Sequence, residues 1–124
     1  MPPTIPPYLT EQPARADIDA LQGAAVLDFG TNWCGFCKGA APRVEEALAA
    51  HGGGLQHIKV EDGSGRPLGR SFGIKLWPTL VVLQDGREVA RVVRPTQASE
   101  VAQALAAGHN APHESTPQTP VPGR

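Results

Sequence analysis

Asn32-Trp33-Cys34-Gly35-Phe36-Cys37-Lys38 contains both cysteines of this 124-residue chain. The run that precedes it, residues 24–29, is short and mostly apolar and predicts a buried β-strand. Residues 40–48 then place their apolar side chains at the spacing of an amphipathic helix. A strand that delivers two cysteines to the first turn of a helix is an arrangement suited to thiol chemistry.

The spacing of the two cysteines predicts different roles for them. Cys34 and Cys37 lie three residues apart, so on a helix they share one face at a separation compatible with a disulfide. The unpaired amide groups and the positive end of the helix dipole lie next to Cys34 and favour its thiolate. We therefore expect Cys34 to be the nucleophile and Cys37 to be the resolving thiol that attacks the mixed disulfide.

A C-x-x-C pair can instead hold zinc or an iron–sulfur cluster together with other ligands. This chain has no second cysteine pair, and its four histidines are scattered along the sequence. The position of the pair between a strand and a helix therefore favours redox chemistry, and no metal is expected.

The composition excludes several classes of protein. A formal net charge of -1 provides no basic surface for nucleic acid. The longest apolar runs are too short to span a bilayer, and no charged start followed by an apolar stretch marks a signal peptide. We expect a single-domain cytoplasmic protein that binds neither nucleic acid nor membrane, with a signal removed beforehand as the alternative.

The first half of the chain predicts a helix, a strand, a second helix and a second strand. Residues 1–7 contain four prolines and predict a flexible lead-in. Helical spacing predicts a helix over residues 8–21, before the first strand. Pro42 lies inside the second helix and is expected to kink it. Residues 55–60 form the next predicted strand, parallel to the first because a helix connects the two.

The second half predicts a short helix, a hairpin and a final helix. Their expected ranges are 63–73 for a glycine-rich loop with its short helix, 79–83 and 88–93 for two antiparallel strands, and 97–106 for the final helix. Asp85-Gly86 is a strong signal for the hairpin turn. Residues 109–124 are rich in proline and polar side chains and predict a disordered tail. Together the elements predict an α/β domain over residues 8–108, with a central mixed sheet flanked by helices.

Asp28 is the one charged residue of the first predicted strand. An ionised carboxylate without a partner is costly in an apolar strand, so burial favours its protonated form. A carboxyl group behind Cys37 can take the proton of that thiol during resolution. We therefore interpret Asp28 as a catalytic base, with a structurally paired aspartate as the alternative.

Several separate elements keep the mutual spacing of the thioredoxin family. They are Asp28-Phe29, the run from Trp33 to Lys38, Pro42, Trp77-Pro78-Thr79 and the Asp85-Gly86 hairpin. Roughly residues 20–108 resemble this family, which implies a thioredoxin fold and thiol-disulfide oxidoreductase activity. The resemblance also implies that Pro78 follows a cis peptide bond beside the sulfurs, and that substrate backbone pairs with Trp77.

The sequence departs from a typical thioredoxin at four positions near the site. Phe36 replaces the proline between the cysteines, where the dipeptide tunes the redox potential. Gly30 stands where the family usually has a bulky aromatic residue, and Trp77 where a smaller residue is usual. Arg94 falls about where a glycine normally lets substrate approach. The first strand of the typical fold is also missing or very short in this sequence.

The remaining candidates surround the two cysteines. Five residues are predicted to bind extended protein substrates: Trp33, Gly35, Phe36, Trp77 and Pro78. Aromatic residues are, however, more often plain core or surface residues.

Three further residues are predicted to tune the site. His57 occupies the strand position where the family often carries a lysine near the buried aspartate, which predicts that it tunes Asp28. Lys38 and Arg94 are candidates for stabilising a thiolate by charge, although exposed cations contribute little.

These observations predict a protein-disulfide reductase that needs no bound cofactor and acts as a monomer. Protein disulfides are the expected substrates, and a flavin-dependent thioredoxin reductase or another thiol donor is the expected recycling partner, by family resemblance. A disulfide oxidase or isomerase that runs the same cycle in reverse is one alternative. A non-catalytic binding module built on the same scaffold is another.

Overall fold

The fold is an α/β arrangement of one sheet between helices. The structure, a computed structural model, describes residues 7–11, 13–52 and 54–109. The strands are β1 (Ala24–Gly30), β2 (Leu55–Glu61), β3 (Thr79–Gln84) and β4 (Arg87–Val93), and the helices are α1 (Arg15–Asp19), α2 (Gly35–His51), α3 (Pro67–Ser71) and α4 (Ala98–His109). The predicted order of elements from the first helix onward is confirmed.

The strand order in the sheet is β2-β1-β3-β4. β1 and β2 are parallel and joined through α2, whereas β3 is antiparallel to both β1 and β4, so the predicted mixed sheet is confirmed. The β3–β4 turn has positive φ at Asp85 (53°) and Gly86 (80°), as a type I′ hairpin turn requires. On β4, the Arg91 guanidinium binds the Glu88 carboxylate at 2.6 Å.

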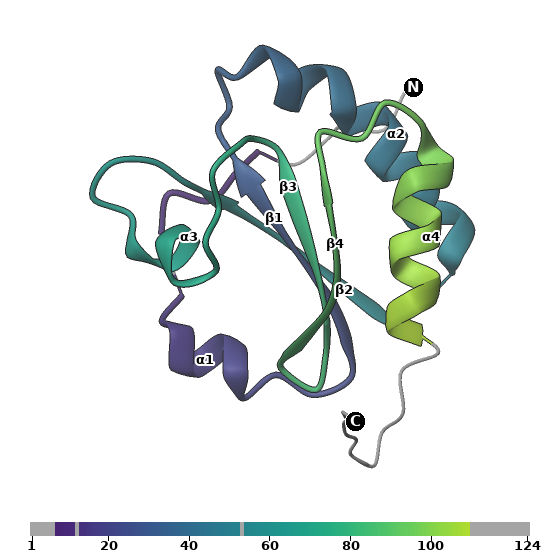
Figure 1. The fold of residues 1–124 in the computed structure, drawn as a ribbon, viewed down its shortest axis with the longest axis horizontal. Helices are drawn as coiled ribbons and strands as arrows, with labels where there is room; N and C mark the ends of the chain where they lie inside the picture. Colours follow the sequence, from purple (N-terminus) through teal and green to yellow (C-terminus); the bar gives the residue numbers. More distant parts are fainter. Residues whose placement is uncertain (1–6, 12, 53, 110–124) are drawn as a thin grey trace.

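The two faces of the sheet carry separate apolar clusters, because successive side chains of a strand point to opposite faces. Ala25, Leu27 and Phe29 of β1 pack with α1 and α3, whereas Val26 packs with α2 and α4. Figure 1 shows α1 and α3 on one side of the sheet and α4 on the other. Asp28 and Gly30 alternate with Phe29, so they lie on the same face as Val26, under α2.

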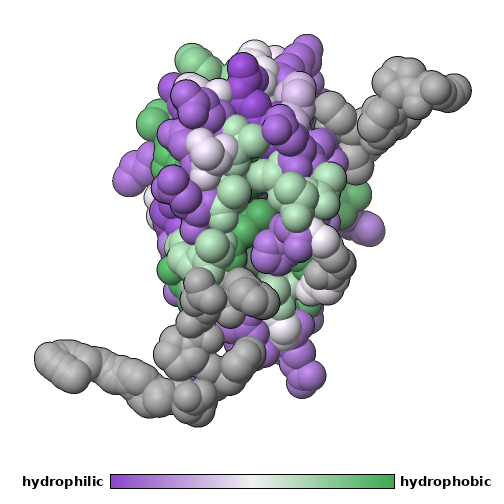
Figure 2. All heavy atoms as spheres, turned by 90° about the vertical axis from the view of Figure 1, so that its right-hand side faces the viewer, coloured by the Kyte–Doolittle hydropathy of each residue, from purple (hydrophilic) through white to green (hydrophobic). Residues whose placement is uncertain are grey.

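The side of the molecule that carries α4 is mainly polar. Figure 2, which views the side that carries α4, shows hydrophilic residues around a strip of apolar ones. None of the helices in the described part of the chain is long and apolar enough to cross a membrane.

The first helix is much shorter than predicted. Residues 8–21 were expected to be helical, but α1 covers Arg15–Asp19 only. Leu9 instead forms a parallel bridge with Val60: its N–H donates to the Lys59 carbonyl, and its carbonyl accepts from the Glu61 N–H, both at 2.9 Å. Pro13 would also break a helix that ran through it. This single bridge agrees with the expectation that the first strand of the fold is missing or very short.

The last helix is longer than predicted. It was expected over 97–106, yet it continues through Gly108 to His109. Glycine lowers helix propensity by only about 1 kcal/mol, which does not force a helix to end. The predicted lead-in, apart from residue 7, and the predicted tail beyond residue 109 lie outside the described residues.

Candidate active site

Cys34 and Cys37 lie at the start of α2, where the sequence predicted them. Cys34 is the N-cap residue, and its sulfur accepts a hydrogen bond from the Cys37 N–H at 3.3 Å. Both residues are free thiols and both are buried. An amide that donates to the Cys34 sulfur at a helix N-terminus stabilises negative charge on that sulfur.

Cys37 lies one turn further into the protein and is 3% exposed. Burial raises the pKa of the Cys37 thiol to about 11, and its hydrogen bond with Cys34 acts in the same direction. The Cys37 thiol therefore keeps its proton at neutral pH, and it needs a base before it can act as a nucleophile.

Asp28 is 3% exposed and has a partner on each carboxylate oxygen. The Tyr8 hydroxyl donates to Oδ1 at 2.9 Å, and His57 Nε2 lies 3.1 Å from Oδ2. His57 Nδ1 in turn lies 3.9 Å from a carboxylate oxygen of Glu45. The structure therefore brings the predicted base and its predicted tuning residue together, and it adds Tyr8, which the sequence analysis did not identify.

Gly30 stands where the family usually has an aromatic residue. The space that it leaves is filled by the side chain of Tyr8. A Cβ atom on Gly30 would lie 2.7 Å from the Tyr8 hydroxyl oxygen and 2.5 Å from the Cys37 sulfur. Tyr8 is buried and packs in one cluster with Cys34 and Cys37. The aromatic side chain at this place therefore comes from the N-terminal segment instead of from β1.

Trp77 and Pro78 lie at the same end of the molecule as the sulfurs. The Trp77–Pro78 peptide bond is cis, as the resemblance implied. The Trp77 indole N–H donates to Asp62 Oδ2 at 2.8 Å, and its ring meets that of Trp33 edge to face with centroids 5.8 Å apart. Trp33 is 71% exposed. These contacts fix Trp77 and leave Trp33 available on the surface.

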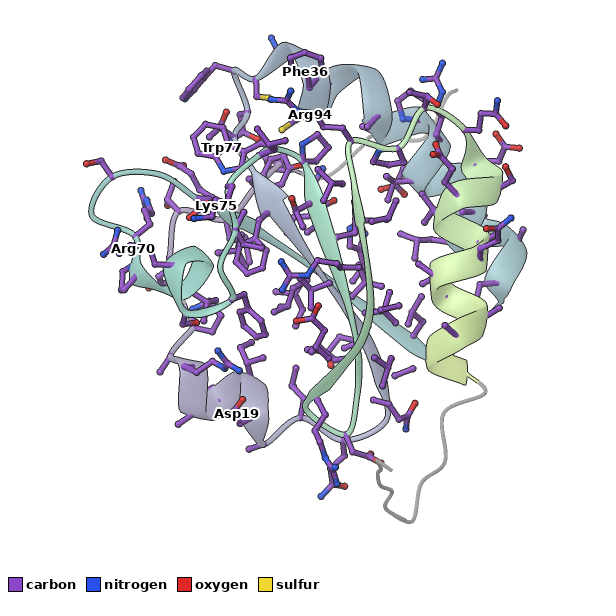
Figure 3. All side chains as sticks on the ribbon, in the orientation of Figure 1. Asp19, Phe36, Arg70, Lys75, Trp77 and Arg94 are labelled. Atoms are coloured by element: carbon purple, nitrogen blue, oxygen red, sulfur yellow. The ribbon has the colours of Figure 1, made fainter. Side chains whose placement is uncertain are left out.

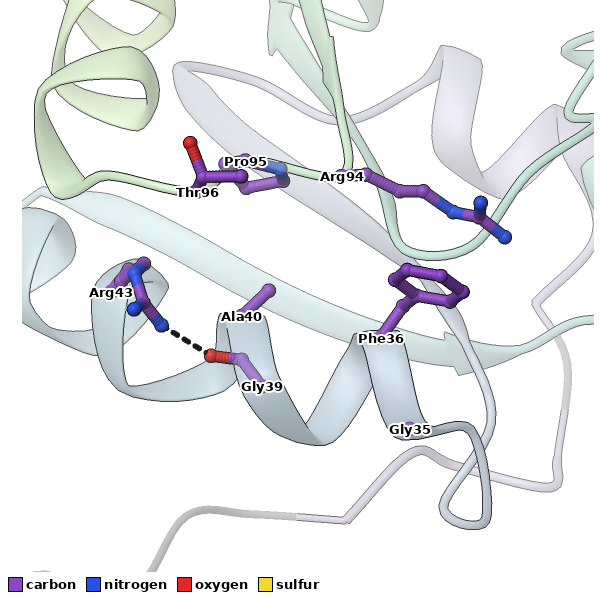
Figure 4. Close-up of a pocket in the computed structure, with 8 residues that line it drawn as sticks. All are labelled: Gly35, Phe36, Gly39, Ala40, Arg43, Arg94, Pro95 and Thr96. Carbon is purple, nitrogen blue, oxygen red and sulfur yellow. Dashed lines mark hydrogen bonds between the residues drawn. The ribbon is translucent and has the colours of Figure 1, made fainter.

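A groove of about 500 Å³ runs between α2 and the segment after β4. Phe36, which is 60% exposed, lies on one wall, and Arg94 lies on the other with its guanidinium carbon 3.8 Å from the Phe36 ring centroid (Figure 4). Gly35 also lines the groove. Figure 3 shows Phe36, Trp77 and Arg94 gathered at the end of the molecule that holds the two sulfur atoms.

Arg94 makes a backbone contact that the sequence did not suggest. Its Nε donates to the Trp77 carbonyl at 2.8 Å. Its φ is 50°, in the left-handed region that favours glycine, which explains why a glycine is usual at this position. Trp77 was predicted to pair with substrate backbone, and its carbonyl therefore already accepts a hydrogen bond from Arg94.

Two lysines lie near Cys37. Lys38 is exposed and lines a second pocket with Tyr8 and Cys37. Lys59 is buried, pairs in register with Asp28, and places its ammonium 4.4 Å from the Tyr8 ring centroid. Lys59 was missed, but the parallel pairing of β1 with β2 and the alternation from His57 to Lys59 put it on the face of Asp28. In residues 7–11, 13–52 and 54–109, no group of three His, Cys, Asp or Glu side chains could hold a metal ion.

Comparisons with known proteins agree with this geometry. The thioredoxin family model matches residues 7–107. A thioredoxin from Chlamydia muridarum is 43% identical over 72 residues, which cover 57% of this chain and 69% of that protein. Reduced thioredoxin 2 from Pseudomonas aeruginosa superposes with a TM-score of 0.76 at 48% identity, over 87% of this chain and all of that one. Thioredoxin from Nicotiana alata superposes at 0.61 with 28% identity, over 74% and 78% of the two chains. The chain therefore belongs to the thioredoxin family and is a thiol-disulfide oxidoreductase.

Proposed function

We propose that this oxidoreductase reduces protein disulfides in the cytoplasm as a monomer and is recharged by a flavin-dependent thioredoxin reductase or another thiol donor. The observation that carries the proposal is the contrast between the two sulfurs. Cys34 accepts an amide hydrogen bond at the start of α2, while Cys37 is buried next to the Asp28 and Tyr8 pair.

In the first half of the cycle, the Cys34 thiolate attacks one sulfur of the substrate disulfide. A bond forms between Cys34 and that sulfur, and the other substrate sulfur leaves as a thiolate. Its position as the N-cap of α2 supports this role, because the amide N–H of Cys37 lies 3.3 Å from the attacking sulfur. Lys38 follows on the exposed side of the same turn and adds a weak, salt-sensitive attraction for the thiolate.

In the second half, Cys37 attacks Cys34 and releases the reduced substrate. The pKa of about 11 for the Cys37 thiol means that a base must accept its proton at neutral pH. Asp28 is a buried carboxylate that accepts a hydrogen bond from Tyr8, and Tyr8 packs against Cys37, which supports Asp28 as that base. The Nε2 atom of His57 lies 3.1 Å from the other oxygen of Asp28, and this contact supports His57 as the residue that tunes the carboxylate.

The substrate binds along the apolar rim around Cys34. Trp33 and Phe36 are large and exposed there, and Gly35 keeps the backbone beside Cys34 open. Pro78 and Trp77 supply the backbone edge that an extended substrate segment can join. Exposed aromatic residues at a site that must accept unfolded protein support this assignment.

The Arg94 contact predicts a gain in substrate binding when it is removed. Arg94→Ala frees the Trp77 carbonyl for a substrate N–H and removes the guanidinium from the Phe36 ring. One additional hydrogen bond contributes about 0.5–1.5 kcal/mol, so the KM for a protein disulfide should fall by a factor of about 2 to 10. Steady-state kinetics with a disulfide-containing protein substrate measure this change.

Arg43→Ala is the matched control, because Arg43 contributes the same charge to the same groove. Its guanidinium binds the Gly39 carbonyl and not that of Trp77. An equal fall in KM for Arg43→Ala and Arg94→Ala would show that charge, and not the freed carbonyl, causes the effect.

The redox potential of the Cys34–Cys37 pair tests the direction of the reaction. We expect a value at or below the cytosolic glutathione potential of about -220 to -260 mV. Equilibration in glutathione buffers, followed by alkylation and mass spectrometry, gives the potential. A value well above this range would overturn the reductase assignment in favour of an oxidase or isomerase.

Insulin reduction tests whether the protein is catalytic in this direction. With NADPH and a flavin-dependent thioredoxin reductase, we expect many insulin molecules to be reduced for each molecule of this protein. The variant that lacks both thiols, Cys34→Ser with Cys37→Ser, provides the background rate. Turnover equal to that background would favour a non-catalytic binding module.

A further inference from the structure

Tyr8 reaches the two sulfurs from a segment outside the sheet and the long helices. The neighbouring residue Leu9 is bridged to β2, and the Tyr8 N–H donates to Asn32 Oδ1 at 2.8 Å. The ring lies under the Lys59 ammonium, 4.4 Å from its centroid, and fills the space beside Gly30. These contacts hold the ring in one place, so its hydroxyl has a defined position.

The hydroxyl of Tyr8 connects Asp28 with Cys37. It donates to Asp28 Oδ1 at 2.9 Å, which leaves its own lone pairs free to accept a proton. The position of a Cβ atom on Gly30 lies within 3 Å of both the hydroxyl oxygen and the Cys37 sulfur, so these two atoms are neighbours. Burial raises the pKa of Tyr8, as does the charge of Asp28, so the hydroxyl stays neutral and retains a proton to pass on.

The partners of Asp28 favour an indirect route from the thiol. Oδ1 already accepts the Tyr8 hydroxyl, and Oδ2 lies against His57. The Tyr8 hydroxyl contacts the carboxylate, and the Tyr8 side chain packs in one cluster with Cys37. A proton that leaves Cys37 therefore has a path through the hydroxyl that needs no movement of the carboxylate.

We propose that the Tyr8 hydroxyl relays the proton of Cys37 to Asp28 when Cys37 resolves the mixed disulfide. The proposal rests on the role of Asp28 as base that is proposed above. The Cys37 S–H proton moves to the Tyr8 oxygen while the Tyr8 O–H proton moves to Asp28 Oδ1. The freed electron pair on the Cys37 sulfur forms the bond to the Cys34 sulfur. The bond between Cys34 and the substrate sulfur breaks, and that sulfur leaves as a thiolate. The two cysteines are oxidised to a disulfide, and the substrate disulfide has gained two electrons.

Stopped-flow reaction of the reduced protein with 5,5′-dithiobis(2-nitrobenzoate) separates the two steps. The first equivalent of released chromophore reports the attack by Cys34, and the second reports the attack by Cys37. Tyr8→Phe keeps the ring beside Gly30 and removes only the hydroxyl. We expect its first phase to match that of the wild type and its second phase to be slower by about tenfold or more, because a positioned proton-transfer group contributes 10²–10⁴-fold and water replaces it in part.

Thr31→Val is the matched control. The Thr31 hydroxyl is buried near the site and has no hydrogen-bond partner among the described residues, so its removal deletes a hydroxyl without interrupting the relay. Both phases of Thr31→Val should match those of the wild type. A similar slowing in Thr31→Val and Tyr8→Phe, or a slowing of both phases in Tyr8→Phe, would show a structural role and overturn the relay.

The solvent isotope effect identifies proton transfer directly. In mixtures of H₂O and D₂O, a relay that moves two protons gives a curved dependence of the second phase on the deuterium fraction in the wild type. Tyr8→Phe should show a smaller effect, and an unchanged effect would overturn the relay. Asp28→Asn separates the two proposals: if it slows the second phase while Tyr8→Phe does not, the base assignment stands and the relay fails. If Asp28→Asn leaves the second phase unchanged, the base assignment itself fails.

Discussion

Cys34→Ser is expected to lower insulin reduction by several orders of magnitude, to the background rate, because it removes the attacking thiolate. Cys37→Ser is expected to lose turnover to the same extent for a different reason. Its Cys34 still attacks, but the mixed disulfide cannot be resolved within the protein. Non-reducing electrophoresis and mass spectrometry should therefore find a covalent adduct of substrate with Cys37→Ser alone.

The two variants together test the assigned roles of the sulfurs. The double variant Cys34→Ser/Cys37→Ser is the control and should form no adduct. If Cys34→Ser trapped substrate and Cys37→Ser did not, the roles of attacking and resolving thiol would be reversed. Such a reversal would also contradict the burial of Cys37 and its raised pKa.

Gly30→Ala is expected to destabilise the reduced protein by about 1–3 kcal/mol, as overpacking of a filled core does. The added Cβ would lie 2.5 Å from the Cys37 sulfur and 2.7–2.8 Å from two atoms of the Tyr8 phenol group. Either the sulfur or the ring must move, so the variant should also resolve mixed disulfides more slowly. Urea unfolding under reducing conditions measures the change in the free energy of unfolding.

Gly39→Ala is the matched control for this substitution. Gly39 lies in α2, and a Cβ on it would meet nothing within 4 Å. Alanine is the better helix former, so Gly39→Ala should stabilise the protein by up to about 1 kcal/mol. Combining Gly30→Ala with Tyr8→Ala tests the cause, since the loss for Gly30→Ala should shrink once the ring is gone. The same loss in both backgrounds would argue against competition for this space.

Most of the fold was predictable because its signals are local. The strand before the cysteines, the helix after them and the Asp85-Gly86 turn are each encoded within a few residues. The location of Asp28 also followed from the sequence. It is the only charge in a buried strand, and strand alternation places it on the same face as Val26, which packs against α2.

The environment of Cys37 was not predictable in the same way, because it depends on contacts between distant segments. The spacing of Leu9, Ala14 and Ile18 suits a helix, but pairing of Leu9 with β2 and burial of Tyr8 outweigh it. Gly30 was recognised as a departure from the family, yet nothing near it in the sequence says which side chain takes the space. Tyr8 is the only tyrosine of the chain and lies 22 residues away.

The contacts of Trp77 were also hidden from the sequence. Its indole N–H donates to Asp62, 15 residues away in the chain, and its carbonyl accepts from Arg94, 17 residues away. The sequence identified Arg94 only as a cation that replaces a glycine and as a candidate for stabilising a thiolate by charge. Its left-handed backbone conformation decides where the guanidinium points, and a single sequence does not reveal that conformation.

The ion pair between Arg91 and Glu88 lies on β4, the strand at one border of the described sheet. An edge strand offers unpaired backbone N–H and C=O groups with which a strand of another molecule can pair, and such pairing can start aggregation. Charged side chains on such a strand discourage that attachment. The protein therefore exposes Trp33 and Phe36 at the end that bears the thiols, while the charges on its edge strand disfavour pairing between copies.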